Sequence, residues 1–176
     1  MGMLEERPSI SEVIVKLNQG VSGAGNALVD LRGVADTGDL GRRSLVAQRV
    51  RSMQLESAIT PMAAYEGKFE ENGGIVEERI VGEQLLSPSV QLRVRPDKSV
   101  ELLSTHDQLL GGASGQSYLG CIFPADPAYS RLISEPAITI GERLAKEGAL
   151  GRFALDFVVK RDTAGDWSAY AIELTA

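Results

Sequence analysis

Cysteine is almost absent from this chain of 176 residues, in which Cys121 stands alone. A single thiol excludes an internal disulfide framework and a zinc site built from several cysteines, and it fits a reducing, cytoplasmic setting. A nucleophilic thiolate needs electropositive neighbours, which the adjacent Ile122 and Phe123 do not provide. We therefore expect Cys121 to be a small buried apolar residue.

Long hydrophobic runs and an excess of positive charge are also missing. No stretch approaches the roughly 18 apolar residues of a membrane span, and the acidic start Met1–Pro8 lacks the basic-then-apolar order of a signal peptide. Eighteen basic against twenty-four acidic residues give a formal charge of -6, which argues against a role on nucleic acid or at a membrane. The expected partners are small molecules, and any anionic ligand must be held locally.

Histidine is as scarce as cysteine, since His106 is the only one. With one histidine and no Gly-x-Ser-x-Gly elbow, the sequence gives little support to a hydrolase. His106 stands beside Asp107 and Gln108, ahead of the glycine-rich segment Gly111–Gly115. A catalytic role on the substrate side and a structural, hydrogen-bonding role are both open for this histidine.

What is present is an ordinary globular balance, 43% hydrophobic and 24% charged, long enough for one sizeable core. Apolar residues at helical spacing predict helices within 42–55, 62–72 and 127–148, the last kinked or split at Pro136. Alternating or β-branched runs predict strands within 10–17, 27–31, 75–83, 87–96, 100–104, 153–159 and 170–174, and Gly111–Gly120 is expected to be a loop. Helices placed between hairpins favour an α+β fold over a doubly wound parallel sheet.

The first feature with chemical meaning is Lys16, on a predicted strand directly ahead of a loop with glycines at Gly20, Gly23 and Gly25. Backbone N–H groups of such a loop can face phosphate oxygens while a lysine supplies positive charge. The spacing is not that of a P-loop, so a simple flexible hairpin turn is the alternative.

The second feature is the pair Asp156 and Glu173, each inside an apolar strand-like run. Folding these runs back on the turn Asp162–Asp166 would bring both carboxylates to one face, where two like charges are costly unless a cation lies between them. Hard oxygen ligands suit Mg²⁺. The alternative is exposure on an edge strand.

The third feature is Glu77–Glu83, a strand end with several carboxylates that can accept hydrogen bonds from a ribose or a base amino group. By itself the segment also fits a solvated strand end.

In this order, the features resemble the ATP-grasp superfamily. The similarity covers nearly the whole chain, and within the superfamily it is greatest to peptide ligases of the pheganomycin-biosynthesis type. The segments on which the resemblance rests are 21–28 (VSGAGNAL), 76–83 (VEERIVGE), 104–112 (STHDQLLGG), 118–121 (YLGC), 151–157 (GRFALDF) and 171–173 (AIE).

The resemblance implies two α+β subdomains, here residues 1–86 and 87–176, whose antiparallel sheets grip ATP. It also implies a reaction in two steps, in which a phosphoryl group is transferred to a carboxylate and an amine then attacks the acyl phosphate. It implies Mg²⁺ as cofactor and Arg152 and His106 as catalytic groups. The implied nucleotide and metal residues are Lys16 at the phosphates, the flap residues Gly20, Ser22, Gly23, Gly25 and Asn26, the adenine hinge Glu77, Glu78 and Ile80, Glu83 at the ribose, and Asp156, Glu173 and Thr175 at the metal.

Two departures from the family pattern bear on activity. The family usually has Glu-Ile-Asn after the second carboxylate, whereas this chain has Glu173-Leu174-Thr175, and a threonine hydroxyl is a poorer ligand than an amide oxygen. The N-terminal domain and the C-terminal tail of the family are also expected to be absent, leaving the fold incomplete. The expected function is therefore the ATP- and Mg²⁺-binding portion of a carboxylate–amine ligase. The alternative is a catalytically incomplete ATP-grasp-like binding or assembly module, such as a homodimer.

Overall fold

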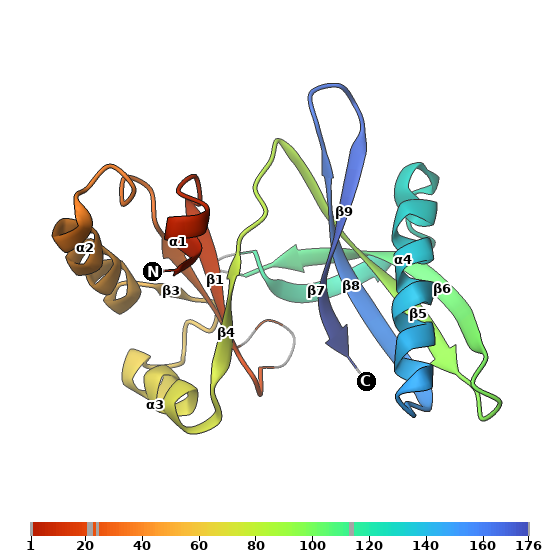
Figure 1. Ribbon diagram of the computed structural model, residues 1–176. Helices are drawn as coiled ribbons and strands as arrows, with labels where there is room; N and C mark the ends of the chain where they lie inside the picture. Colours follow the sequence, from red (N-terminus) through yellow and green to blue (C-terminus); the bar gives the residue numbers. More distant parts are fainter. Residues whose placement is uncertain (1, 21–22, 24, 113–114, 176) are drawn as a thin grey trace. The chain divides into compact units, whose positions relative to one another are not determined.

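The computed structural model describes residues 2–20, 23, 25–112 and 115–175 (Figure 1). The chain divides into two compact units. The first comprises Met1–Arg79 and Leu110–Tyr118, and the second comprises Ile80–Leu109 and Leu119–Ala176. Within the described ranges, no helix is long and apolar enough to cross a membrane.

The first unit is a four-stranded antiparallel sheet in the order β3-β2-β1-β4, accompanied by helices. Its elements are α1 (Gly2–Glu6), β1 (Glu12–Leu17), β2 (Asn26–Asp30), α2 (Asp39–Arg51), β3 (Gln54–Leu55), α3 (Met62–Asn72) and β4 (Gly74–Glu78).

The core of this unit forms because β1 and β2 alternate in polarity. Val13 and Val15 of β1 are buried together with Val29 of β2 and Tyr65 of α3. Successive side chains of a strand point to opposite faces, so Lys16 lies on the face of the sheet away from this core. The alternation thus places the predicted phosphate-binding lysine outside the hydrophobic cluster.

The second unit is a five-stranded sheet in the order β7-β6-β5-β8-β9 with one long helix. The pairings of β5 with β6 and β8, and of β8 with β9, are antiparallel. Its elements are β5 (Gln84–Val94), β6 (Val100–Gly111), β7 (Ser117–Ile122), α4 (Pro127–Lys146), β8 (Gly151–Arg161) and β9 (Trp167–Thr175).

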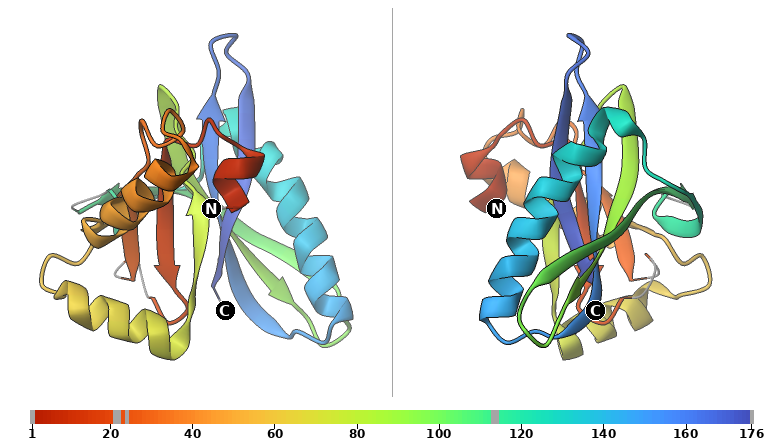
Figure 2. Two further views of the ribbon diagram at one scale, coloured as in Figure 1. Left: turned by 60° about the vertical axis from the view of Figure 1, so that its left-hand side comes forward. Right: turned by 90° about the vertical axis from the view of Figure 1, so that its right-hand side faces the viewer.

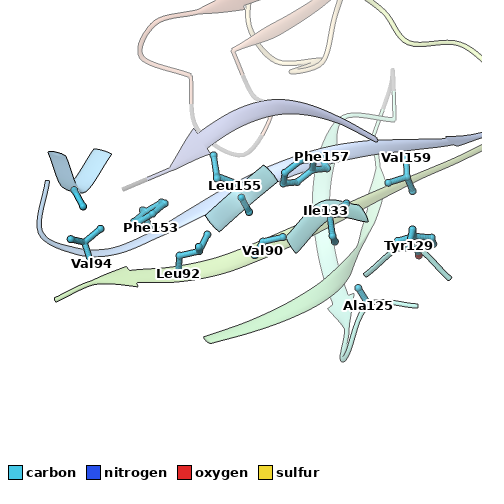
Figure 3. Close-up of a cluster of buried hydrophobic side chains, with 12 residues drawn as sticks. Val90, Leu92, Val94, Ala125, Tyr129, Ile133, Phe153, Leu155, Phe157 and Val159 are labelled. Atoms are coloured by element: carbon cyan, nitrogen blue, oxygen red, sulfur yellow. The ribbon is translucent and has the colours of Figure 1, made fainter. Parts of the chain in front are cut away.

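Helix α4 lies along one face of this sheet (Figure 2). It begins after Asp126, whose carboxylate accepts a hydrogen bond from Ala128 N at 2.8 Å. Ile133 is fully buried with Val90 of β5 and Phe157 of β8 (Figure 3), and a fully buried side chain of this size contributes about 1.5–3 kcal/mol. Because α4 covers this face, the residues that alternate with Val90 and Phe157 lie on the other face of the sheet.

Most predicted elements are confirmed, and the exceptions have local causes. Helix α3 spans 62–72 as predicted, whereas α4 continues through Pro136 as a single helix and is not split. A loop was expected at Gly111–Gly120, but strand β7 occupies the second half of it. The sequence pattern missed this strand because glycines lie next to its strand-forming residues. Cys121 on β7 is half-buried rather than buried.

Gly141 of α4 and Gly67 of α3 distinguish a packed helical glycine from an unpacked one. A Cβ on Gly141 would lie 2.9 Å from Val100 Cγ1 and 3.3 Å from Phe153 Cζ, whereas a Cβ on Gly67 of α3 would meet nothing within 4 Å. We predict that Gly141→Ala destabilises the fold by about 1–3 kcal/mol through overpacking. Gly67→Ala should stabilise it by about 0.5–1 kcal/mol, because alanine has the higher helix propensity. Urea unfolding measures both, and equal effects of the two substitutions would contradict the packing described.

Candidate functional site

Lys16 is held by an ion pair on the face of the first sheet away from the core. Its Nζ lies 2.7 Å from Glu77 Oε2, and the two side chains are 13% and 32% exposed. Lys16 is opposite Ile75 in the β1–β4 register, so Glu77, two residues further along β4, shares its face. The pair therefore fixes a half-buried ammonium group at the end of β1, next to the glycine loop.

The glycine loop has a narrow neck made of backbone contacts. Leu17 N donates to Gly25 O at 3.0 Å, Gly20 N donates to Leu17 O at 3.0 Å, and Asn26 N donates to Gly23 O at 2.8 Å. A Cβ on Gly25 would lie 2.7 Å from Gly20 Cα, so a larger residue at position 25 would push the two stems apart. Of the predicted flap residues, Ser22 lies outside the described part of the chain.

A second chain segment contacts this loop, and sequence reasoning missed it. Glu56, only 5% exposed, accepts hydrogen bonds from Ser117 N at 3.1 Å and Ser117 Oγ at 2.7 Å. A Cβ on Gly23 would lie 2.3 Å from Gln116 O, and a Cβ on Gly112 would lie 1.9 Å from Glu56 Oε1. Only the glycine content of both segments hinted at such close approach, and no local pattern marks Glu56.

The predicted hinge residues are divided between the units. Glu77 and Glu78 belong to the first unit and Ile80 and Glu83 to the second. Glu78 forms an ion pair with Arg7, just as Glu77 forms one with Lys16. Glu83 is exposed and lines a hollow of about 350 Å³ with residues of the β8–β9 turn, which are Arg161, Asp162, Thr163, Ala164 and Gly165.

The face of the second sheet away from α4 carries a row of polar residues on four neighbouring strands. His106 of β6 pairs with Ser89 of β5, Ser89 pairs with Asp156 of β8, and Asp156 pairs with Glu173 of β9. Directly opposed residues share a face of the sheet. The two carboxylates predicted to meet are therefore adjacent, and His106 lies two strands from Asp156 in the same row.

An irregularity in the β8–β9 ladder places Glu173 opposite Asp156. The register changes from Phe157–Ala171 to Asp156–Glu173, so β9 has one extra residue, Ile172, at this point. Without it, Glu173 would be opposite Leu155, on the face that α4 covers, because a shift of one residue reverses the side a strand residue faces. The bulge thus brings Glu173 to the face of Asp156.

Three of the other residues predicted in this unit lie on the same face as Asp156. Thr175 pairs with Ala154, two residues from Asp156, and Arg152 pairs with Arg93, two residues further along β8. Residues two apart on a strand point the same way. Asp156, Glu173, Thr175 and Arg152 therefore share one face of one sheet.

His106 is buried and does not form the polar cluster that its neighbour Asp107 suggested. Asp107 points to the other face, where it accepts a hydrogen bond from the Tyr129 hydroxyl at 2.7 Å. His106 is 8% exposed, packs on Phe123 at 4.8 Å between ring centroids, and its Nδ1 has no hydrogen-bond partner among the described residues. Burial lowers the pKa of His106, and the nearby carboxylates of Asp156 and Asp107 oppose this shift. The imidazole is therefore neutral near pH 7.

The residues around Asp156 fit Mg²⁺ only if other ligands complete its coordination shell. Within the described ranges, no three His, Cys, Asp or Glu residues lie close enough to hold a metal ion. Two carboxylates and a hydroxyl on one face match the usual Mg²⁺ arrangement, in which one or two carboxylates bind the ion and substrate phosphates and water complete the shell.

Comparison with known proteins agrees with this architecture. The chain superposes on the biotin carboxylase domain of the 2-oxoglutarate carboxylase from Hydrogenobacter thermophilus, solved with MgADP, ADP and bicarbonate, with a TM-score of 0.62 at 15% identity. The match covers 99% of this chain and 32% of that one. The prediction of an α+β ATP-grasp fold is confirmed. The family model described as IQCH-like, ATP-grasp matches residues 44–175, and the chain belongs to this family.

Two curated relatives share detectable sequence similarity. The L-propargylglycine–L-glutamate ligase of Streptantibioticus cattleyicolor is 30% identical over 177 residues, which cover 98% of this chain and 35% of the ligase. The IQ motif-containing protein H of Danio rerio is 28% identical over 107 residues, or 60% of this chain and 10% of that protein. The chain thus spans about a third or less of the length of these relatives.

The burial of His106 predicts how stability depends on pH. Because the His106 pKa is lowered from its usual 6.5, the folded state binds a proton on this imidazole less readily than the unfolded chain does. Stability should therefore fall as the pH drops through 6.5, where the unfolded chain begins to bind the proton. His106→Gln lacks the titrating group and should lose less stability between about pH 7.5 and about pH 5.5. Urea unfolding at both pH values measures the difference. Identical pH dependence in the two proteins would show that burial does not hold the imidazole neutral.

Proposed function

We propose that this chain is the ATP- and Mg²⁺-binding portion of an ATP-grasp carboxylate–amine ligase, which forms an amide or peptide bond through an acyl phosphate. The observation on which this depends most is the register that sets Asp156 opposite Glu173 with Thr175 on the same face. Two further findings support it: a relative over nearly the whole chain is a ligase of two amino acids, and a structural neighbour was solved with MgADP.

In this proposal the first unit binds the phosphates. Lys16 supplies the positive charge, and its ion pair with Glu77 fixes the position of the ammonium group. The backbone N–H groups of the flap, which comprises Gly20, Ser22, Gly23, Gly25 and Asn26, donate to the phosphate oxygens. The segment from Glu77 through Glu78 and Ile80 to Glu83 contacts adenine and ribose, partly through its backbone.

The second unit holds the metal and the reacting groups. Asp156 and Glu173, with Thr175 as a weaker neutral ligand, hold Mg²⁺, which when bound neutralises phosphate charge. A substrate carboxylate oxygen attacks the γ-phosphorus and ADP leaves. The amine then attacks the acyl carbon and inorganic phosphate leaves. Arg152 stabilises the transferring phosphoryl or acyl phosphate, and neutral His106 accepts the proton that the amine releases.

Calorimetry of the full chain with ATP, with and without Mg²⁺, tests the proposal. Lys16→Met should weaken ATP binding about 10- to 100-fold, the value of a hydrogen bond to a charged group. Asp156→Asn should remove the Mg²⁺-dependent part of the affinity. The exposed Lys98 and Asp36 provide matched controls, and Lys98→Met and Asp36→Asn should bind as the wild type does. No binding at millimolar ATP by the folded wild-type chain would refute the proposal.

The second candidate is a catalytically incomplete ATP-grasp-like binding or assembly module, including a homodimer. The hydroxyl of Thr175, where the family pattern has an asparagine, favours it because it weakens the metal site. Incubation with MgATP, L-glutamate or L-propargylglycine, and hydroxylamine separates the two functions, since hydroxylamine traps an acyl phosphate as a hydroxamate. ADP and hydroxamate formed together would support the ligase, whereas ATP binding without either product would support the module.

A further inference from the structure

Tyr65 has a hydroxyl group that the proposed chemistry does not use. The residue lies on α3 and is only 2% exposed. Its Oη lies 3.1 Å from Val15 O and 3.2 Å from Gly25 O, so one proton is shared between two backbone acceptors. Burial raises the pKa of Tyr65 to about 12, and the hydroxyl therefore remains a donor near neutral pH.

The two acceptors flank the glycine loop. Val15 directly precedes Lys16 on β1, and Gly25 is the last loop residue before β2. Gly25 O also accepts the hydrogen bond from Leu17 N. The Tyr65 hydroxyl thus joins both stems of the loop at the neck, next to the lysine.

On the side of α3, a second hydrogen bond supports the first stem of the loop, because Asn18 Nδ2 donates to Asn72 O at 2.9 Å. A hollow of about 400 Å³ lies there, lined by Gly20 and Gly25 of the loop, by Tyr65 and Lys68 of α3, and by neighbouring residues. Glycine backbone next to an open space can shift at little steric cost. The contact from Tyr65 therefore limits this movement.

We infer that Tyr65 is a positioning residue for the phosphate end of the bound nucleotide, acting through the neck of the glycine loop and through the residue that precedes Lys16. A phenylalanine ring would fill the same core volume, so the hydroxyl is the part that serves the loop. This inference rests on the proposed nucleotide-binding function and assigns a role within it.

The test compares ATP with adenosine, which lacks phosphates. In the full chain, Tyr65→Phe should raise the Kd for MgATP about fivefold, the usual value of one hydrogen bond, and leave the Kd for adenosine almost unchanged. The matched control is Tyr129→Phe, which removes another buried hydroxyl, the one that donates to Asp107 in the second unit. It should leave the ratio of the two Kd values unchanged.

Hydrogen exchange gives a second readout that does not depend on a ligand. In Tyr65→Phe the amides of Leu17 and Asn26, whose hydrogen bonds close the neck, should exchange faster than in the wild type, and those of α4 should not. An unchanged ratio of Kd values or unchanged exchange at the neck overturns the inference and leaves the proposed function standing. Failure of the wild-type chain to bind MgATP overturns both.

Discussion

The pairing of Asp156 on β8 with Glu173 on β9 is the constraint on which the candidate metal site depends. Like charges directly opposite one another destabilise a sheet, and a divalent cation would offset this cost. The bulge at Ile172 adds a further constraint, because it alone gives Glu173 the same face as Asp156. The hydrophobic packing of α4 occupies the opposite face. Fold stability and the proposed chemistry therefore use separate sides of the same strands.

The first unit also places its core residues and its proposed binding residues on opposite faces of a strand. Val13 and Val15 of β1 enter the core, while Lys16 faces away from it and is held by Glu77. The glycine loop that follows depends on contacts from elsewhere in the chain. Tyr65 reaches it from α3, and Gln116 approaches Gly23 from the segment that Glu56 anchors through Ser117. The described ends of the proposed phosphate-binding loop are thus attached to the sheet and to α3 at defined points.

Sequence patterns predicted what depends on neighbouring residues. The period of apolar residues indicated α3 and the strands around Asp156 and Glu173, and the turn between those strands indicated that the two carboxylates meet. Contacts between distant segments could not be predicted in this way. Nothing near Glu56 signals that its carboxylate binds Ser117, and nothing near Tyr65 signals that its hydroxyl reaches Gly25. The bulge in β9 is equally hidden, since it results from how two strands pair and not from either strand alone.

The most direct measurement places the metal on the molecule. Mn²⁺ replaces Mg²⁺ in many phosphate sites and broadens the NMR signals of nearby nuclei. With ATP present, Mn²⁺ should broaden the amide signals of residues 154–157 and 172–175 first. Broadening confined to another acidic segment, such as the β8–β9 turn at Asp162–Asp166, would contradict the assignment of Asp156 and Glu173 as metal ligands.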